Sequence, residues 1–405
     1  MTSEPLTEDA GRGTARRDRR YRLVRAAQWF AGIEADPYAL VLRAGAAEAD
    51  AAEEAVRALG PLHHSTLLDT WVTADRAVAQ EITTHPAFDA PAADAPGGDP
   101  PPFRSAVLTL DRASAAPLAA LTAFGGPLLW ADDADCVEKR TATWSRTVLA
   151  ALGDRFDLAE DFARRLTGPV LAEQLGLPEA AHERFSRLLP HCRYVLDGLL
   201  CPQPHATARA AEAAETALAG LLTEALHTST ADTVRASQVM ALSAAEPTAV
   251  LLSNAVRLLL DEPGGWRRLA EDPARAGEAV EHTLRTAPPV RLESRAVRSA
   301  VTLAGTDLPE GARVTLLVAA VNRDPQAAPD APPFGLCADL HFALSAHLIR
   351  AVARAALRTL AETLPGLRAD GDPVTRLRSP VLRAPARQPV AGNTPFPNPP
   401  QELRH

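Results

Sequence analysis

A long amphipathic helix near the carboxyl end places the strongest constraint on the fold. Arg350, Arg354 and Arg358 share one face of it. Apolar residues recur every three or four positions on the other face: Leu344, Leu348, Val352, Ala355, Ala356, Leu360 and Leu364. This spacing is typical of a helix with one side against a core and the other toward solvent.

Similar patterns follow one another through most of the chain. Residues 135–226 predict several consecutive helices, and 234–261 predict a long central one. Only residues 63–75 and 294–325 indicate strands, with 314–321 (VTLLVAAV) as an apolar strand. The sequence therefore predicts a mainly α fold with a small β portion. We expect a disordered segment at 1–20, a single helical domain at 21–389 and a Pro-rich tail at 390–405.

Composition excludes several functional classes. With 46% hydrophobic and 23% charged residues, the 405-residue chain resembles an ordinary globular protein that buries a core. Its net charge of −8 argues against a nucleic-acid-binding role, which usually needs a basic surface. No run approaches the roughly 18 uncharged apolar residues of a membrane span, and the first 20 residues lack the apolar region of a signal peptide. We expect a cytoplasmic protein that binds neither nucleic acid nor membrane.

The four cysteines do not indicate a metal site. Cys136, Cys192, Cys201 and Cys337 are scattered, without a C-x-x-C motif or a histidine at metal-binding spacing. This arrangement favours free thiols in a reducing compartment.

The first predicted helix, at residues 21–33, has an apolar face that allows two interpretations. Leu23, Ala26, Ala27, Phe30 and Ile33 share the face, and Trp29 lies beside it. The favoured interpretation is that this helix packs on the domain, together with a second helix that begins after Asp36-Pro37. The alternative is that the apolar face binds a partner protein.

The segment that leads into the long carboxyl-terminal helix resembles the heme-binding segment of bacterial cytochromes P450. In that family a loop of the form F-G-x-G-x-H-x-C-x-G enters a helix that carries A-x-L-A-R. In the matching run HFALSAHLIR, His341 stands for the loop histidine and Arg350 for the helix arginine, while Ala343 replaces the cysteine. The family's cysteine supplies the thiolate that binds iron, which a methyl group cannot do.

The central helix also resembles its counterpart in this family but lacks a catalytic group. The family pattern A-G-x-E-T-T places an acid and an alcohol over the iron, and the run SAAEPT at 243–248 matches it. Glu246 takes the place of the acid, but Pro247 replaces the alcohol that handles the oxygen proton. Proline cannot donate a proton, and inside a helix it removes a hydrogen bond.

Two of the three charges of the family's E-x-x-R triad are also missing. Arg285 matches the arginine, His282 stands where the glutamate belongs, and Pro333 stands where a second arginine belongs. We expect Arg285 either to find another acceptor, with the adjacent Glu281 as the candidate, or to lie nearer the solvent. Arg295 matches an arginine that meets a heme propionate in the family, and it could equally be a surface arginine.

Together these departures imply that the chain binds no heme. Only six residues separate Phe334 from His341, so the loop is shortened as well as lacking its cysteine. We expect the former heme space to be closed by collapse of this loop and by bulky side chains. The alternative is a rearranged loop that brings Cys337 to an iron.

The chain resembles more specifically a branch of cytochrome P450-like proteins without the ligand cysteine. This resemblance implies a non-catalytic helper, without cofactor or metal, of a glycosyltransferase that transfers TDP-deoxyamino sugars to macrolides or polyketides. It implies a hetero-oligomer with that transferase, and our candidate interface residues are Leu23, Trp29, Phe30 and Ile33. Two other functions remain open: a monooxygenase with Cys337 as heme ligand, and a heme-free small-molecule-binding protein.

Overall fold

The computed structural model describes residues 19, 21–43, 46–89, 134–226, 230–328, 331–336 and 340–392. In the last helix, side chains are described from Ser345 onward. The expectations for the first 18 residues, for Cys337, for the side chains of His341 and Ala343 and for residues 393–405 lie outside this range.

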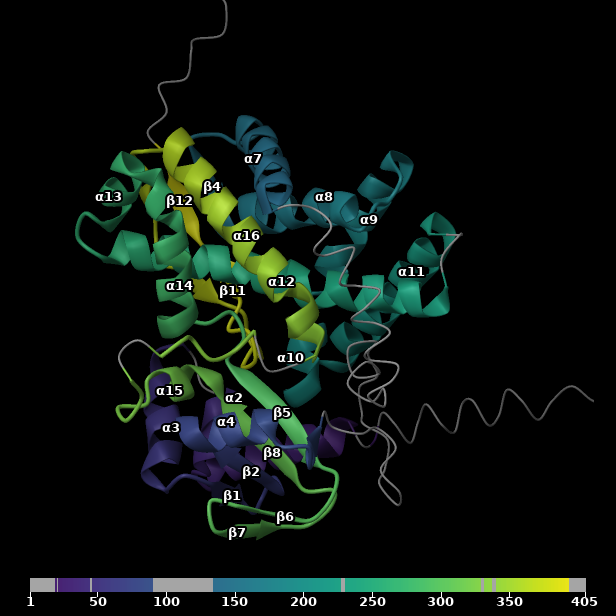
Figure 1. The fold of residues 1–405 in the computed structure, drawn as a ribbon, viewed down its shortest axis with the longest axis vertical. Coiled ribbons are helices and arrows are strands. Elements are labelled where there is room, and N and C mark those ends of the chain that lie inside the picture. Colours follow the sequence, from purple (N-terminus) through teal and green to yellow (C-terminus); the bar gives the residue numbers. More distant parts are fainter. Residues whose placement is uncertain are drawn as a thin grey trace, which may run out of the picture.

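A five-stranded sheet and several short helices form one end of the molecule (Figure 1). The strand order is β1-β2-β8-β5-β3, with β2 and β8 parallel and the other neighbours antiparallel. The strands are β1 (His63–Ser65), β2 (Thr70–Thr73), β3 (Phe88–Asp89), β5 (Leu292–Val297) and β8 (Arg313–Leu317), and the helices near them are α2 (Pro37–Arg43), α3 (Ala46–Ala58), α4 (Arg76–Thr84) and α15 (Val318–Asn322). A hairpin of β6 (Val301–Leu303) and β7 (Thr306–Leu308) extends from this end.

The other end is built from longer helices (Figure 1). They are α7 (Ala134–Ala150), the π-helix η1 (Leu158–Arg164), α8 (Arg165–Gln174), α9 (Glu179–Cys192), α10 (Val195–Leu200), α11 (His205–Ala225), α12 (Ala231–Asp261), α13 (Gly265–Glu271), α14 (Ala276–Thr286), preceded by the 3-10 turn η2 (Pro273–Arg275), and α16 (Leu340–Thr363). Short strands complete this end: β4 (Arg155–Asp157), β9 (Arg368–Ala369), β10 (Val374–Thr375), β11 (Pro385–Arg387) and β12 (Pro389–Ala391). β12 extends two residues into the range expected to be a tail, because it pairs with β4 and β9.

Helix α12 is the axis of the helical part. It contacts α16, η1, α14 and α11. Thr230 caps its first turn by accepting a hydrogen bond from the backbone N–H of Thr233, and the helix continues through Pro247. By length and composition α12 could cross a membrane, but 94% of its most apolar window is buried within the protein. It is therefore the core helix of the fold.

The predicted mainly α fold with a small β portion is confirmed, but one predicted strand is wrong. The apolar run 314–321 is a strand only as far as Leu317, and its second half begins helix α15. Residues Val318 to Val321 are all fully buried. In a continuously apolar run no alternation distinguishes a strand from a buried helix, so the periodicity could not place this boundary.

Candidate functional site

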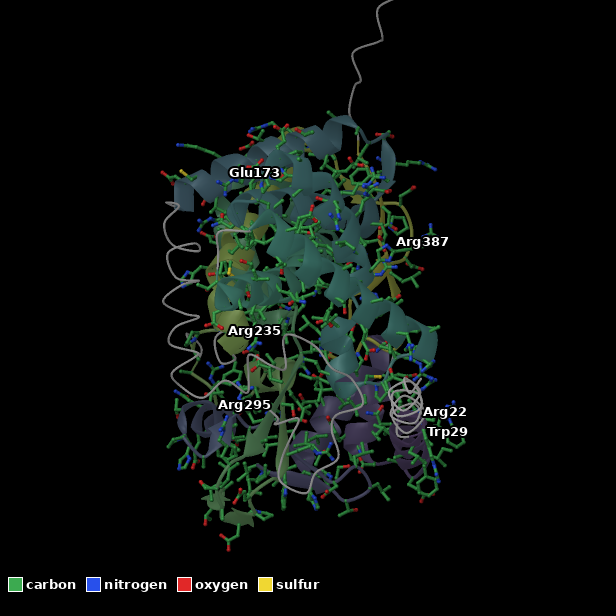
Figure 2. All side chains as sticks on the ribbon, turned by 90° about the vertical axis from the view of Figure 1, so that its right-hand side faces the viewer. Arg22, Trp29, Glu173, Arg235, Arg295 and Arg387 are labelled. Atoms are coloured by element: carbon green, nitrogen blue, oxygen red, sulfur yellow. The ribbon has the colours of Figure 1, made fainter. Side chains whose placement is uncertain are left out.

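The helix at residues 21–33 exposes its apolar face. Trp29 is 60% and Phe30 is 51% exposed, and Leu23 and Ile33 are similarly open. Figure 2 shows Trp29 at the margin of the molecule. The apolar face is therefore not the side by which this helix packs on the domain.

The opposite side of the same helix fixes it to the body of the protein. Tyr21 and Ala31 are buried, and the side-chain amide of Gln28 donates a 2.8 Å hydrogen bond to the carbonyl of Leu200. The next helix, α2, does pack inward as expected, and Asp36 caps it by accepting a hydrogen bond from the backbone N–H of Ala39. The structure therefore presents an anchored helix with an open apolar face.

The two helices that would enclose a heme touch each other directly. The resemblance places the porphyrin between the middle of α12 and the start of α16, with its ligand at position 343. The hydroxyl oxygens of Ser243 and Ser345 are hydrogen-bonded at 2.9 Å, and both side chains are fully buried. A flat ring with van der Waals contacts on both faces needs roughly 7 Å between the atoms that enclose it. Ser243 and Ser345 therefore do not fit a heme.

Small side chains make this close approach possible. Ala244 and Ala346, next to the two serines, are also buried. At this crossing small side chains, not bulky ones, bring the two helices together. The contribution of the shortened loop lies outside the described residues.

Restoring the missing cysteine should not restore heme binding. We expect an Ala343→Cys variant, expressed with ample heme precursor, to purify without a Soret band, because Ser243 and Ser345 still hold the two helices together. An absorption spectrum before and after reduction under carbon monoxide checks this, with an intact cytochrome P450 expressed in parallel. One heme per chain in the variant would contradict it.

Glu246, matched to the proton-relay acid, lies in a buried ion cluster instead. Nη2 of Arg164 donates to its Oε1 at 2.7 Å, and Arg376 donates to the same oxygen. Burial alone would raise the pKa of this carboxyl group, but the charges of Arg376 and Arg164 outweigh that effect and lower the pKa to about 2. Arg376 also lies over the ring of Tyr194 at 4.9 Å, and Arg164 donates to the carbonyl of Pro385. Glu246 therefore joins η1 and the carboxyl-terminal strands to α12.

The remnant of the E-x-x-R triad is rearranged. His282 is exposed, and Pro333 is half-buried. Glu281 binds Nε of Arg350 on α16 at 3.0 Å, so the expectation that it serves Arg285 is wrong. Within the part of the chain that the structure describes, the buried Nε of Arg285 has no hydrogen-bond acceptor. The arginine of the motif is thus left without its usual counter-charges.

Arg295 is buried, which makes the surface alternative wrong. It is 5% exposed, it donates to the carbonyl of Ser294 at 3.1 Å, and its Nη2 lies 3.7 Å from the carboxylate of Glu293. Glu293 thus gives this arginine a counter-charge from its own strand. A heme propionate is not needed to neutralise it.

The described cysteines behave as structural thiols. Cys192 and Cys201 are buried, and burial raises the pKa of each to about 12, which keeps them protonated and unreactive. Cys136 is exposed and also unpaired. Across the described ranges, no group of three or more His, Cys, Asp or Glu side chains could hold a metal ion.

Comparison with known proteins places the chain in a family. No family model matches it. It is 43% identical to TylM3 of Streptomyces fradiae over 95% of each chain, and 36% identical to DesVIII of Streptomyces venezuelae over 91% of this chain and 92% of DesVIII. It is 32% identical to EryCII of Saccharopolyspora erythraea, described as a cytochrome P450 family protein, over 95% of this chain and 99% of EryCII. The open structure of the cytochrome P450 EryK from S. erythraea, 22% identical, matches its fold with a TM-score of 0.73 over 89% of this chain and 99% of EryK. The chain therefore belongs to the cytochrome P450 family, alongside TylM3, DesVIII and EryCII.

Proposed function

We propose that this chain is a heme-free helper of a glycosyltransferase in antibiotic biosynthesis. It binds, stabilises and activates a cytoplasmic transferase that attaches a deoxyamino sugar from a TDP-sugar to a macrolide or polyketide. It carries out no chemistry of its own. Its likeness to TylM3 and DesVIII over nearly the whole chain supports this function.

The hydrogen bond between Ser243 and Ser345 is the observation that carries the proposal. It joins the two helices between which the resemblance places the cofactor of a cytochrome P450, while the surrounding fold is retained. The missing proton donor at Pro247 and the engagement of Glu246 by two arginines support the same conclusion. Because the fold is kept while groups needed for the P450 reaction are missing, we infer that the chain acts by binding another protein at its surface.

The surface offers a place for the partner. The exposed side chains of Leu23, Trp29, Phe30 and Ile33 form an apolar stripe on an anchored helix. Large aromatic side chains are the residues that most often dominate binding energy at protein interfaces. We place the transferase contact on this stripe.

Co-expression with the transferase tests the proposal. The two proteins should elute together as a hetero-oligomer in size-exclusion chromatography, and sugar transfer should depend on this chain. The control replaces it with an intact cytochrome P450 of the same fold, which should support no transfer. A transferase that reaches full turnover alone would contradict the helper function.

A spectrum of the purified chain separates the alternatives. A colourless, folded protein excludes the monooxygenase with Cys337 as ligand. A Soret band at one heme per chain would favour that monooxygenase and overturn the proposal. A small-molecule-binding protein would be colourless too, but would not elute with the transferase.

A further inference from the structure

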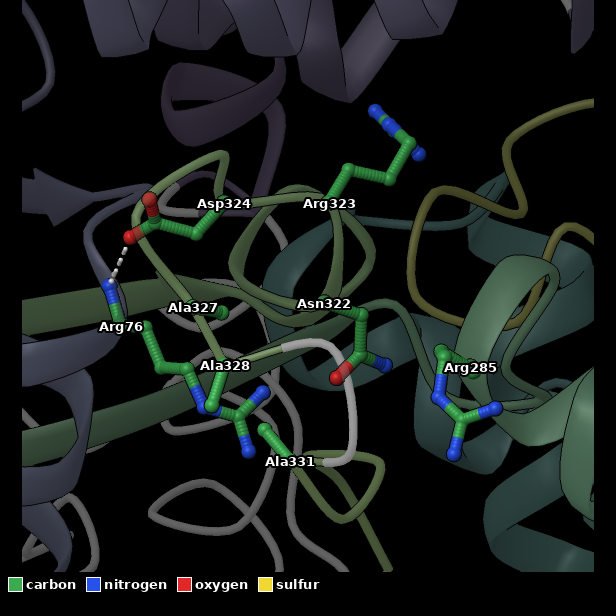
Figure 3. A pocket seen from close by; sticks show the side chains of 8 residues that line it. All are labelled: Arg76, Arg285, Asn322, Arg323, Asp324, Ala327, Ala328 and Ala331. Carbon is green, nitrogen blue, oxygen red and sulfur yellow. Dashed lines mark hydrogen bonds between the residues drawn. The ribbon is translucent and has the colours of Figure 1, made fainter.

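A cavity lined by arginines lies where the sheet end meets the helical end. Its volume is about 260 Å³, and it is bounded by α4, α14 and the segment that follows α15 (Figure 3). Arg76, Arg285, Asn322, Arg323 and Asp324 line it together with three alanines. None of these residues belongs to the exposed helix at 21–33, so the cavity is a separate feature of the molecule.

Two of the charged lining residues are already neutralised. Arg323 binds the buried carboxylate of Glu53 at 2.7 Å, and in Figure 3 its guanidinium group points away from the other lining side chains. Asp324 lies 3.9 Å from Nη1 of Arg57, which supplies its counter-charge, and it accepts the backbone N–H groups of Arg76 at 2.8 Å and of Gln326 at 2.9 Å. These two residues therefore leave little net charge for the cavity itself.

The other two arginines have no counter-charge among the described residues. Arg285 makes no hydrogen bond or ion pair there, and its Nε is buried. The side chain of Arg76 makes one hydrogen bond, to the carbonyl of Pro332. Figure 3 shows both side chains among the lining residues, with Asn322 between them in this view. Two uncompensated positive charges near a cavity repel each other, and an anion there would stabilise both.

The side chain of Asn322 lines the cavity and is held in place by hydrogen bonds to the backbone. Its side-chain amide donates to the carbonyls of Leu284 and Phe334, each at 3.1 Å, and its oxygen accepts from the backbone N–H of Phe334. The polar groups free to bind a ligand are therefore the two guanidinium groups. The three alanines add no polar group to the lining.

We propose that this cavity is a binding site for a phosphate group. Guanidinium groups match phosphate oxygens with paired, charge-assisted hydrogen bonds. A phosphate that carries nearly two negative charges balances Arg76 and Arg285, which a single carboxylate would not do. The volume equals that of about nine liquid waters, so it holds either orthophosphate or the diphosphate of a larger ligand. The arginine of the E-x-x-R motif, which lacks its usual partners here, thus takes a new role.

Calorimetric titration of the isolated chain tests the site. Inorganic phosphate and pyrophosphate are each titrated at constant ionic strength, with chloride as the reference anion. We expect saturable binding that weakens by about tenfold or more in Arg285→Gln and in Arg76→Gln, because each loses a charge-assisted contact. Tighter binding of pyrophosphate would identify a diphosphate-bearing ligand, and equal binding would identify orthophosphate.

Matched variants separate binding from folding. Arg187→Gln removes one positive charge from a largely exposed side chain on α9 and should leave phosphate binding unchanged. Arg285→Lys keeps the charge but not the paired geometry, and should bind with intermediate affinity. Circular dichroism verifies that each variant is folded. If Arg285→Gln does not fold, the test of the site rests on Arg76→Gln. Absence of binding to the native chain, or an affinity of both glutamine variants equal to that of the native chain, would overturn the proposal. Neither result depends on the transferase.

Discussion

Replacement of Glu246 by glutamine should lower the free energy of unfolding by about 3–5 kcal/mol. The carboxylate is 7% exposed and binds Arg164 and Arg376, which are themselves buried. The substitution removes the buried counter-charge that the two guanidinium groups share, and leaves Arg164 with the partly exposed Glu160 at 3.0 Å and Arg376 with Asp197 at 4.0 Å. Urea denaturation followed by circular dichroism measures the loss. The matched control is Glu224→Gln on α11, which breaks an exposed pair with Arg184 and should cost less than about 1 kcal/mol.

The same carboxyl group should make stability depend on pH in the acid range. Its pKa falls from an ordinary 4.5 to about 2 in the folded protein. A group with a lowered pKa stabilises the fold above its unfolded pKa, and loses that contribution as the pH falls through the folded value. The shift corresponds to about 3 kcal/mol. The difference in stability between the native chain and Glu246→Gln should therefore be constant at neutral pH and shrink as the pH falls from 4.5 toward 2. A difference that does not change over this interval would show that Glu246 is not ionised in the fold.

Local features of the fold could be predicted because they depend on near neighbours. The order of helices follows from apolar spacing, and Asp36 caps α2 where the Asp-Pro pair predicts it. The absence of the heme-ligating cysteine at Ala343 and the presence of proline at 247 can be recognised in the sequence as departures from a family pattern. These features require no knowledge of which segments meet in space.

Contacts between distant segments could not be predicted. Glu246 lies 82 residues from Arg164 and 130 from Arg376. A second buried acid, Glu53 on α3, binds Arg291 just before β5 and Arg323 after α15, at separations of 238 and 270 residues. Spacing along the chain carries no signal for such pairs, because the fold alone decides which charges meet.

The exposure of the apolar face of the helix at residues 21–33 could not be predicted from the sequence either. Its apolar periodicity shows that Leu23, Phe30 and Ile33 share a face, but not whether the protein or a partner covers that face. The inner side, with Tyr21 and Ala31, carries fewer large apolar side chains than the outer one. The usual rule that the more apolar side faces the core therefore gives the wrong orientation here.

The exposed apolar face of the helix at residues 21–33 leads to the second prediction with a large expected effect. Replacement of both Trp29 and Phe30 by serine should leave the protein folded, and should weaken binding to the transferase by about thirtyfold or more. Activation at a fixed low concentration of the chain should fall accordingly. Both side chains are more than half exposed, whereas the anchors Tyr21, Gln28 and Ala31 are untouched. The substitution therefore removes an apolar contact surface without removing what holds the helix in place.

The measurement is sugar-transfer rate against the concentration of this chain, together with its elution with the transferase. The control is Leu377→Ser, which removes an 86% exposed leucine from a different part of the chain and should retain full activation. A loss in both variants would reflect general loss of surface hydrophobicity. Full activation by the Trp29/Phe30 variant would place the interface elsewhere, even if the helper function itself holds. A loss confined to that variant requires the contact to lie on the helix at 21–33, because no buried side chain or charged cluster of the fold has been altered.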